Sequence, residues 1–290
     1  MFTGSLVAIV TPFKNGKLDE RAFGDLIEWQ IANGTNGIVP CGTTGESATL
    51  THDEHHRVVK LAVEVVKRRV PVVAGTGSNS TAEAISLTKH AKEAGVDGAL
   101  LITPYYNKPT QEGLYRHYKA VAEAVDLPQV LYNIPGRTGV NMTPSTVSRL
   151  CGLKNIVGIK EGSGSVQQAS EIAQNCGERM TVLAGDDSLT LPMMAVGAKG
   201  VITVAANVVP KDMAELVRSF LAGAIDESRR IHFKLSPLFS ALFYETNPIP
   251  VKEALGMMGR IDPELRLPLC AMGADTKGQL TRVLKDMGLI

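Results

Sequence analysis

A repeat of short apolar runs, each ending in polar or glycine residues and each followed by a segment of helical periodicity, runs through the sequence. Eight such runs occur, at residues 6–10, 37–39, 70–74, 98–102, 129–131, 156–159, 181–184 and 200–202. Their hydrophobicity is continuous rather than alternating, which is typical of parallel strands covered on both faces. Eight strands alternating with helices predict an α/β fold of the (β/α)8 TIM barrel type, and a doubly wound open sheet is the alternative.

Helix-start signals support this alternation. In a capping box, the side chains of the N-cap residue and of the third helical residue each bind the other's backbone N–H group. Three pairs have the required spacing: Thr51 with Glu54, Ser80 with Glu83, and Ser165 with Gln168.

The length of 290 residues leaves a tail after the eighth strand and its helix. This tail reads as helical, and we expect turns at Pro237, Pro248 and Pro263. The sequence therefore predicts a catalytic barrel over residues 1–224 and a helical extension, residues 225–290, packed on it.

Composition excludes several classes of protein. Thirty Lys and Arg residues balance 29 Asp and Glu residues, so nothing favours a nucleic-acid partner or an anionic membrane. No basic segment precedes the first apolar run, and Lys199 interrupts the most apolar window, 191–210, which argues against a signal peptide and a membrane span. The four cysteines form no CxxC pair. We expect a cytoplasmic protein with reduced thiols.

In a (β/α)8 barrel the chemistry takes place where strands end and the following loops begin. The polar residues at these points are Thr11, Thr43, Thr44, Ser78, Tyr105, Tyr106, Tyr132, Lys160, Asp186 and Thr203. Lys160 ends one strand, and Tyr132 ends the strand before it. Partial burial can turn a lysine amine into a nucleophile, and a nearby phenol can relay protons, so this pair suggests imine chemistry. A lysine reaching solvent and a packed core tyrosine are the structural alternatives.

Two features suit anionic ligands. The sequence Cys-Gly-Thr-Thr-Gly-Glu at 41–46 can form a nest of backbone N–H groups, and Arg137 occupies a Pro-Gly-Arg-Thr-Gly loop whose turn does not need an arginine. The cluster of His52, Glu54, His55 and His56 lacks the zincin order, and Glu54 is accounted for by the capping box. We therefore expect no metal there and keep a small-ligand role open for His52 and His55.

Four motifs together carry a family resemblance: Cys-Gly-Thr-Thr-Gly-Glu at 41–46, Thr-Pro-Tyr-Tyr at 103–106, Tyr-Asn-Ile-Pro-Gly-Arg-Thr at 132–138 and Gly-Ile-Lys at 158–160. They resemble the dihydrodipicolinate synthase family, one of the pyruvate-dependent Schiff-base lyases, which also include N-acetylneuraminate lyase. The resemblance covers nearly the whole chain, in order. Two threonines in the first motif favour the synthase over the sialic-acid lyase.

The resemblance implies a role for each matching residue. Lys160 matches the imine-forming lysine, and Thr44, Tyr132 and Tyr106 match a proton-relay triad in which Tyr106 comes from a neighbouring subunit. Arg137 matches the residue that receives the aldehyde's carboxylate. The amides of Thr43 and Thr44 match the pyruvate carboxylate site, lined also by Gly185 and Ile202.

The implied reaction is condensation of pyruvate with L-aspartate-4-semialdehyde through a lysine Schiff base, the first committed step toward diaminopimelate and lysine, without metal or organic cofactor. A related 2-keto acid aldolase acting on a sugar acid, or a non-catalytic small-molecule-binding barrel, are the alternatives.

The resemblance also implies a homotetramer, a dimer of dimers, with feedback inhibition by L-lysine. The residues that match the lysine site are Ser47, Ala48, Leu50, His52, His55, Asn79, Glu83 and Tyr105. Glu83 can pair with an ammonium group, and Asn79 and Tyr105 can donate hydrogen bonds to a carboxylate. The alternative to a ligand-binding role is structural: Glu83 only closes its capping box with Ser80.

Overall fold

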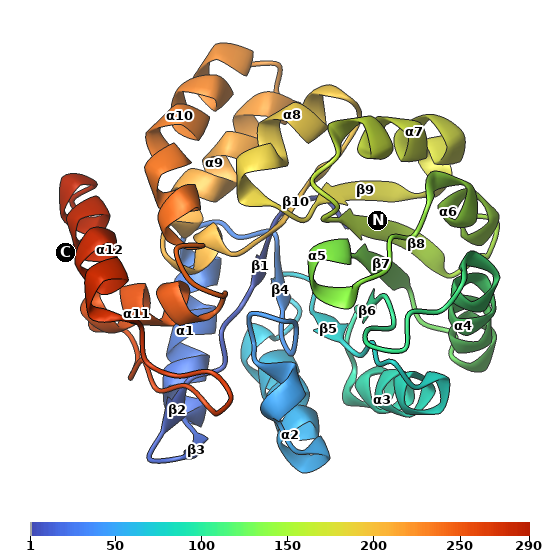
Figure 1. Ribbon diagram of the computed structural model, residues 1–290, viewed down its shortest axis with the longest axis horizontal. Coiled ribbons are helices and arrows are strands. Elements are labelled where there is room, and N and C mark those ends of the chain that lie inside the picture. Colours follow the sequence, from blue (N-terminus) through green and yellow to red (C-terminus); the bar gives the residue numbers. More distant parts are fainter. Residues whose placement is uncertain (1) are drawn as a thin grey trace.

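The computed structural model describes residues 2–290, which form a parallel barrel surrounded by helices (Figure 1). The barrel strands are β1 (Gly4–Ala8), β4 (Gly37–Val39), β5 (Val73–Gly75), β6 (Gly98–Ile102), β7 (Gln129–Asn133), β8 (Ile156–Glu161), β9 (Thr181–Ala184) and β10 (Gly200–Thr203). Their spatial order is β4-β1-β10-β9-β8-β7-β6-β5, and a parallel bridge between Ile38 and Val72 joins the two ends. The (β/α)8 barrel is confirmed, and the open sheet is excluded.

Strand ends differ from the prediction at the positions that matter for chemistry. β7 and β8 each continue two residues beyond the predicted ends, so Tyr132 and Lys160 lie within the strands and face each other in register. β1 begins and ends two residues earlier than predicted. A short antiparallel hairpin of β2 (Phe13–Lys14) and β3 (Lys17–Leu18) was not predicted, because two-residue strands carry no periodic signal.

The connecting helices are α1 (Glu20–Ala32), α2 (His52–Val66), α3 (Thr81–Ala94), α4 (Gln111–Ala124), α5 (Pro135–Thr138), α6 (Pro144–Leu150), α7 (Val166–Cys176), α8 (Thr190–Ala195) and α9 (Pro210–Leu221). Three short 3-10 turns come after strands, η1 (Ser47–Thr49), η3 (Asp187–Leu189) and η4 (Ala205–Asn207), and a fourth, η2 (Gly177–Arg179), follows α7. Three more helices complete the chain, α10 (Ile225–Ala241), α11 (Ile249–Met257) and α12 (Ala274–Asp286), and Figure 1 shows α11 and α12 beside α1. The turn predicted at Pro237 is wrong, because this proline lies inside α10.

The predicted capping boxes are complete at one helix only. Thr51 and Glu54 exchange both hydrogen bonds at the start of α2. Ser80 and Ser165 cap their helices, but the expected return bonds are wrong because other residues engage Glu83 and Gln168. The local pattern therefore located the helix starts, while the tertiary structure decided where the longer side chains point.

Side chains that alternate along the strands build two apolar layers. Leu6 and Ala8 of β1 point into the barrel, where they join Val39, Val73, Leu100, Val130, Tyr132, Leu183 and Ile202. Val7 points outward into the larger core between strands and helices. A barrel filled in this way is a packed core, so a ligand can reach only its rim. No helix within residues 2–290 is long and apolar enough to cross a membrane.

Candidate active site

Lys160 and Tyr132 form the centre of the site at the carboxyl end of the barrel. Both side chains are buried, and the Lys160 Nζ atom lies 4.2 Å from the centroid of the Tyr132 ring. The strand register places the two residues side by side on β7 and β8. The amine therefore sits over an aromatic face beside a phenolic hydroxyl, an arrangement that suits a nitrogen alternating between neutral and cationic forms.

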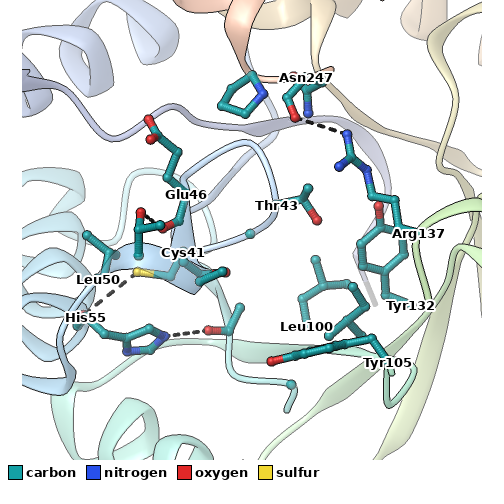
Figure 2. A pocket seen from close by; sticks show the side chains of 18 of the residues that line it. Cys41, Thr43, Glu46, Leu50, His55, Leu100, Tyr105, Tyr132, Arg137 and Asn247 are labelled. Atoms are coloured by element: carbon teal, nitrogen blue, oxygen red, sulfur yellow. Dashed lines mark hydrogen bonds between the residues drawn. The ribbon is translucent and has the colours of Figure 1, made fainter. Parts of the chain in front are cut away.

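A cavity of about 500 Å³ opens beside Tyr132, and Lys160 and Thr44 are not among the residues that line it (Figure 2). Its lining includes Thr43, Tyr132 and Arg137 on one side and His52, Glu83 and other residues of the predicted lysine site on the other. The volume is in the range of small-ligand sites. Residues of both predicted sites thus line the same cavity.

The loop after β4 has the geometry expected of an anion-binding nest. Cys41 and Glu46, at its two ends, have left-handed backbone conformations with φ of 55° and 53°. Within residues 2–290, the backbone N–H groups of Thr43 and Thr44 have no hydrogen-bond acceptor. Strained ends and free amides in a loop at the cavity rim indicate a site for a carboxylate.

Asn247, between α10 and α11, connects two of the predicted functional residues. Its Nδ2 atom donates to the Thr44 hydroxyl at 3.0 Å, and its carbonyl oxygen accepts from the Arg137 guanidinium at 3.0 Å. Figure 2 shows the second contact across the mouth of the cavity. Asn247 therefore sets both the position of the Thr44 hydroxyl and the direction in which Arg137 points.

A buried ion pair anchors the loop at 41–46. Lys252 of α11 is fully buried, and its Nζ atom donates to Glu46 at 2.6 Å and to the Thr11 carbonyl at 2.9 Å. Burial lowers the pKa of Lys252, while the Glu46 carboxylate opposes this change. Removing either partner would leave an uncompensated buried charge, at a cost of about 3–5 kcal/mol.

The chain after β9 comes so close to β8 that only glycine fits at position 185. The Gly185 amide donates to the Glu161 carbonyl at 2.7 Å, and a Cβ atom there would lie 2.9 Å from that oxygen. Ile202, on β10, packs inside the barrel in the same cluster as Tyr132.

Glu83 faces the cavity rather than its own helix start. Its carboxylate accepts from the Ser78 hydroxyl and lies 3.0 Å from Nε2 of His52, and the Ser78 contact, more than His52, lowers the pKa of Glu83. The Glu83 carboxylate and burial raise the pKa of Tyr105, burial being the larger cause. An anionic group beside a phenol and an imidazole can receive an ammonium group.

The other residues predicted for the lysine site also line the cavity, with one exception. His55 is buried and its Nε2 atom lies 2.8 Å from the Gly75 carbonyl oxygen, and burial lowers its pKa. Seven of the eight residues line the cavity: Ser47, Ala48, Leu50, His52, His55, Glu83 and Tyr105. Asn79 does not, and its carbonyl oxygen instead accepts from Asn107.

Tyr106 lies outside its own site. Its side chain is 89% exposed, and its backbone has a φ of 71°, which is uncommon for a bulky residue.

The histidines at 52–56 make contacts with other side chains. The ring of His56 stacks on that of His90 with centroids 3.4 Å apart, and His52 pairs with Glu83. Within residues 2–290 no group of three or more potential ligands could hold a metal ion.

Sequence reasoning missed three residues that shape the site. Asn247 and Lys252 lie in the helical tail, and their partners Thr44 and Glu46 lie about 200 positions earlier, so no local pattern could indicate the contacts. Asp187, discussed below, follows Asp186 directly, and only the three-dimensional structure distinguishes the buried carboxylate from its capping neighbour.

A buried lysine beside a tyrosine at the rim of a (β/α)8 barrel defines the class of protein as a barrel lyase. Comparison with known proteins narrows the class. The chain belongs to the Dihydrodipicolinate synthetase family, whose model matches residues 1–287.

Known members are similar over their whole length. The 4-hydroxy-tetrahydrodipicolinate synthase of Geotalea uraniireducens is 61% identical over 290 residues and all of both chains. A chloride-inhibited dihydrodipicolinate synthase from Acinetobacter baumannii, solved with pyruvate, is 49% identical with a TM-score of 0.98 over all of both chains. The enzyme from Cyanidioschyzon merolae, solved with lysine bound, is 41% identical with a TM-score of 0.96, over all of this chain and 99% of that one. These similarities support the synthase, and they give no support to the sugar-acid aldolase or to the non-catalytic barrel.

Proposed function

We propose that this lyase condenses pyruvate with L-aspartate-4-semialdehyde to give 4-hydroxy-tetrahydrodipicolinate, through an imine on Lys160. The observation that carries the proposal is the placement of the Lys160 amine at the barrel rim, 4.2 Å from the ring of Tyr132. Relatives 61% identical over the full length are named as this synthase.

The proposed roles follow from position. Lys160 attacks the pyruvate ketone, and the protonated imine that forms draws electrons away from the methyl group, which loses a proton. The resulting enamine adds to the aldehyde. Tyr132 and Thr44, with Tyr106 from a second copy of the chain, relay the protons. The exposure of Tyr106 and its absence from the lining of its own cavity support this contribution in trans.

Two anion sites orient the substrates. The free amides of Thr43 and Thr44 receive the pyruvate carboxylate, and Gly185, after β9, and Ile202, on β10, complete the lining of this site. Arg137, directed by Asn247, receives the carboxylate of the aldehyde substrate. A guanidinium group binds a carboxylate through two parallel hydrogen bonds, so it selects a short acidic substrate.

Trapping with borohydride tests the assignment. Reduction in the presence of pyruvate should inactivate the protein and add one reduced pyruvate to the peptide that contains Lys160, as measured by peptide mass spectrometry. Lys199, at the opposite end of the barrel where β10 begins, serves as the internal control and should stay unmodified. Labelling elsewhere, or none, would contradict the mechanism.

We further propose that L-lysine binds in the part of the cavity around Glu83 and inhibits the enzyme, and that the protein works as a tetramer in the cytoplasm. The lysine-bound structure of the Cyanidioschyzon merolae relative supports the ligand. We also propose that residues 1–224 form the catalytic barrel and residues 225–290 an extension that completes its rim through Asn247 and Lys252.

A further inference from the structure

Some of the charges buried in this protein form ion pairs and others do not. The Lys, Asp and Glu side chains buried within residues 2–290 are Glu46, Lys160, Glu161, Asp187, Lys252 and Glu253. Glu46 pairs with Lys252, and Glu253 pairs with Lys277 at 2.6 Å. The other three, Lys160, Glu161 and Asp187, have no such ion pair within the described residues.

Glu161 is stabilised by hydrogen bonds on the outer side of β8. It accepts hydrogen bonds from the Ser163 amide at 2.7 Å and from the side chains of Asn133 and Gln168, each at 3.1 Å. As the neighbour of Lys160 along a strand, its side chain points to the opposite face of the barrel wall. Glu161 therefore provides no charge inside the site.

Asp187 begins η3, directly after the β9 strand end. One of its carboxylate oxygens accepts from the amides of Val204 at 3.1 Å and Ala205 at 2.8 Å, which follow the end of β10. The other oxygen, Oδ1, is buried and has no hydrogen-bond partner within the described residues. A buried carboxylate with a free oxygen is costly unless it interacts with a positive charge nearby.

The cation on the neighbouring strand is Lys160. β9, which leads to Asp187, lies between β8 and β10, and Lys160 pairs in register with Leu183 of β9. Burial raises the pKa of Asp187 to about 6, whereas the Thr203 hydroxyl, the Ala205 amide and the charge of Lys160 oppose this change. The carboxyl is therefore ionised at neutral pH.

Few other charges reach Asp187. The negative charge of Asp186 raises the pKa of Asp187 further. The helices α8 and α10 pack against η3, and their buried positions carry apolar side chains or hydroxyl groups but no charge. Lys160 is thus the cation whose charge acts on Asp187.

We propose that Asp187 is a positioning residue for the imine-forming lysine: its carboxylate holds the chain after β10 in place and balances the positive charge of the Lys160 nitrogen, first as ammonium and then as protonated imine. This inference rests on the proposed function. It assigns to one carboxylate the electrostatic support that keeps the imine protonated and therefore able to draw electrons from the pyruvate methyl group.

The variant Asp187→Asn tests this role because it retains an oxygen that can accept both amides and removes the charge. Borohydride trapping with pyruvate is followed from pH 5 to pH 10, alongside turnover. Without the anion the ammonium form is less favoured, so the pH midpoint of trapping should move down by about 0.5–1 unit. Turnover at pH 8 should fall at least about 10-fold, because the protonated imine loses its counter-charge. Wild type and variant should converge below pH 6, where Asp187 is protonated.

Asp186→Asn is the matched control. Its carboxylate caps η3 by accepting from the Ser188 amide at 3.0 Å, and its removal should leave the trapping midpoint where it is. Asp187→Ser, a second uncharged variant, should shift the midpoint in the same direction as Asp187→Asn.

A wild-type trapping midpoint in a folded Asp187→Asn or Asp187→Ser protein would overturn the inference while leaving the proposed function intact. Loss of folding in both variants would also overturn it, by showing that the carboxylate serves stability alone. Failure of the wild-type protein to trap pyruvate at Lys160 would instead contradict the proposed function itself.

Discussion

The side-chain amide of Asn247 donates a hydrogen bond to the hydroxyl of Thr44 at 3.0 Å, although the two residues are 203 positions apart in the chain. The bond leaves the Thr44 hydroxyl proton free to point elsewhere, because the oxygen acts as the acceptor. A hydroxyl held in this way can pass a proton to a neighbouring phenol.

Asn247→Ala should therefore impair turnover more than substrate binding. The variant loses the bond to Thr44 but keeps the backbone carbonyl that binds Arg137, so kcat should fall about 10–100-fold with little change in KM for the aldehyde. Steady-state kinetics with both substrates measures this. Asn175→Ala, at an exposed position of α7, should behave as wild type. An increase in KM at unchanged kcat would place Asn247 in binding rather than in the relay.

Tyr132→Phe should retain the fold and the aromatic face under Lys160 but lose the phenolic hydroxyl. We expect kcat to fall roughly 10²–10⁴-fold, the usual scale for lost acid–base catalysis, while borohydride still traps pyruvate. Tyr118→Phe provides the control, because that hydroxyl bonds the Leu101 carbonyl inside the core at 3.3 Å. It should cost about 1 kcal/mol of unfolding free energy and no activity. Normal turnover in Tyr132→Phe would show that the tyrosine is only packed.

Glu83→Ala should weaken the binding of L-lysine about 10–100-fold, as expected for loss of a charged hydrogen-bonded pair. Titration calorimetry with and without pyruvate measures it, and because coupling between two sites is reciprocal, pyruvate should change the affinity for lysine in the wild type. Glu93→Ala, at an exposed position of the same helix, should leave lysine binding unchanged. If millimolar lysine leaves the wild-type rate untouched, the inhibitory site is misassigned.

Glu54→Gln should destabilise the protein in a pH-dependent manner. Two hydrogen bonds of 2.6 Å from Arg266 hold the pKa of Glu54 at about 2, below its ordinary value. A carboxyl whose pKa is lowered in the folded state contributes stability above the unfolded-state pKa and loses it as the pH falls through the folded-state value. The variant should thus lose about 1–2 kcal/mol at pH 7 and match the wild type near pH 2.

Urea unfolding at pH 7, 4 and 2.5 measures the difference. Glu64→Gln, which removes an exposed carboxylate of the same helix, should change the unfolding free energy by less than about 0.5 kcal/mol. An equal loss at every pH would mean that the Glu54 side chain acts through packing rather than charge.

Hydrophobic periodicity was enough to predict the barrel, because eight buried parallel strands leave continuous apolar runs that few other folds require. The ends of β7 and β8 were predicted two residues short, since Tyr132 and Lys160 are polar residues that stay in the strand. The hairpin of β2 and β3 and the helix through Pro237 depend on packing that no local pattern encodes.

The sequence predicts only those site residues that carry a local sequence signal. Lys160 and Tyr132 stand at strand ends, where chemistry is expected, and family resemblance added their roles. Glu83 has the spacing of a capping residue, but its contacts with Ser78 and His52 direct its side chain toward the cavity. These contacts are visible only in the three-dimensional structure. Asn247 looks like an ordinary turn residue before a proline until Thr44 is placed next to it.

The buried pair of Lys252 and Glu46 joins residues separated by 206 positions. All eight barrel strands come before Lys252 in the chain. A chain cut before α11 would keep every barrel strand, but the Glu46 carboxylate would have no cation to neutralise it in a dry interior. The loop at 41–46 therefore depends on residues in the last quarter of the sequence, so a complete set of strands does not by itself complete the rim of the barrel.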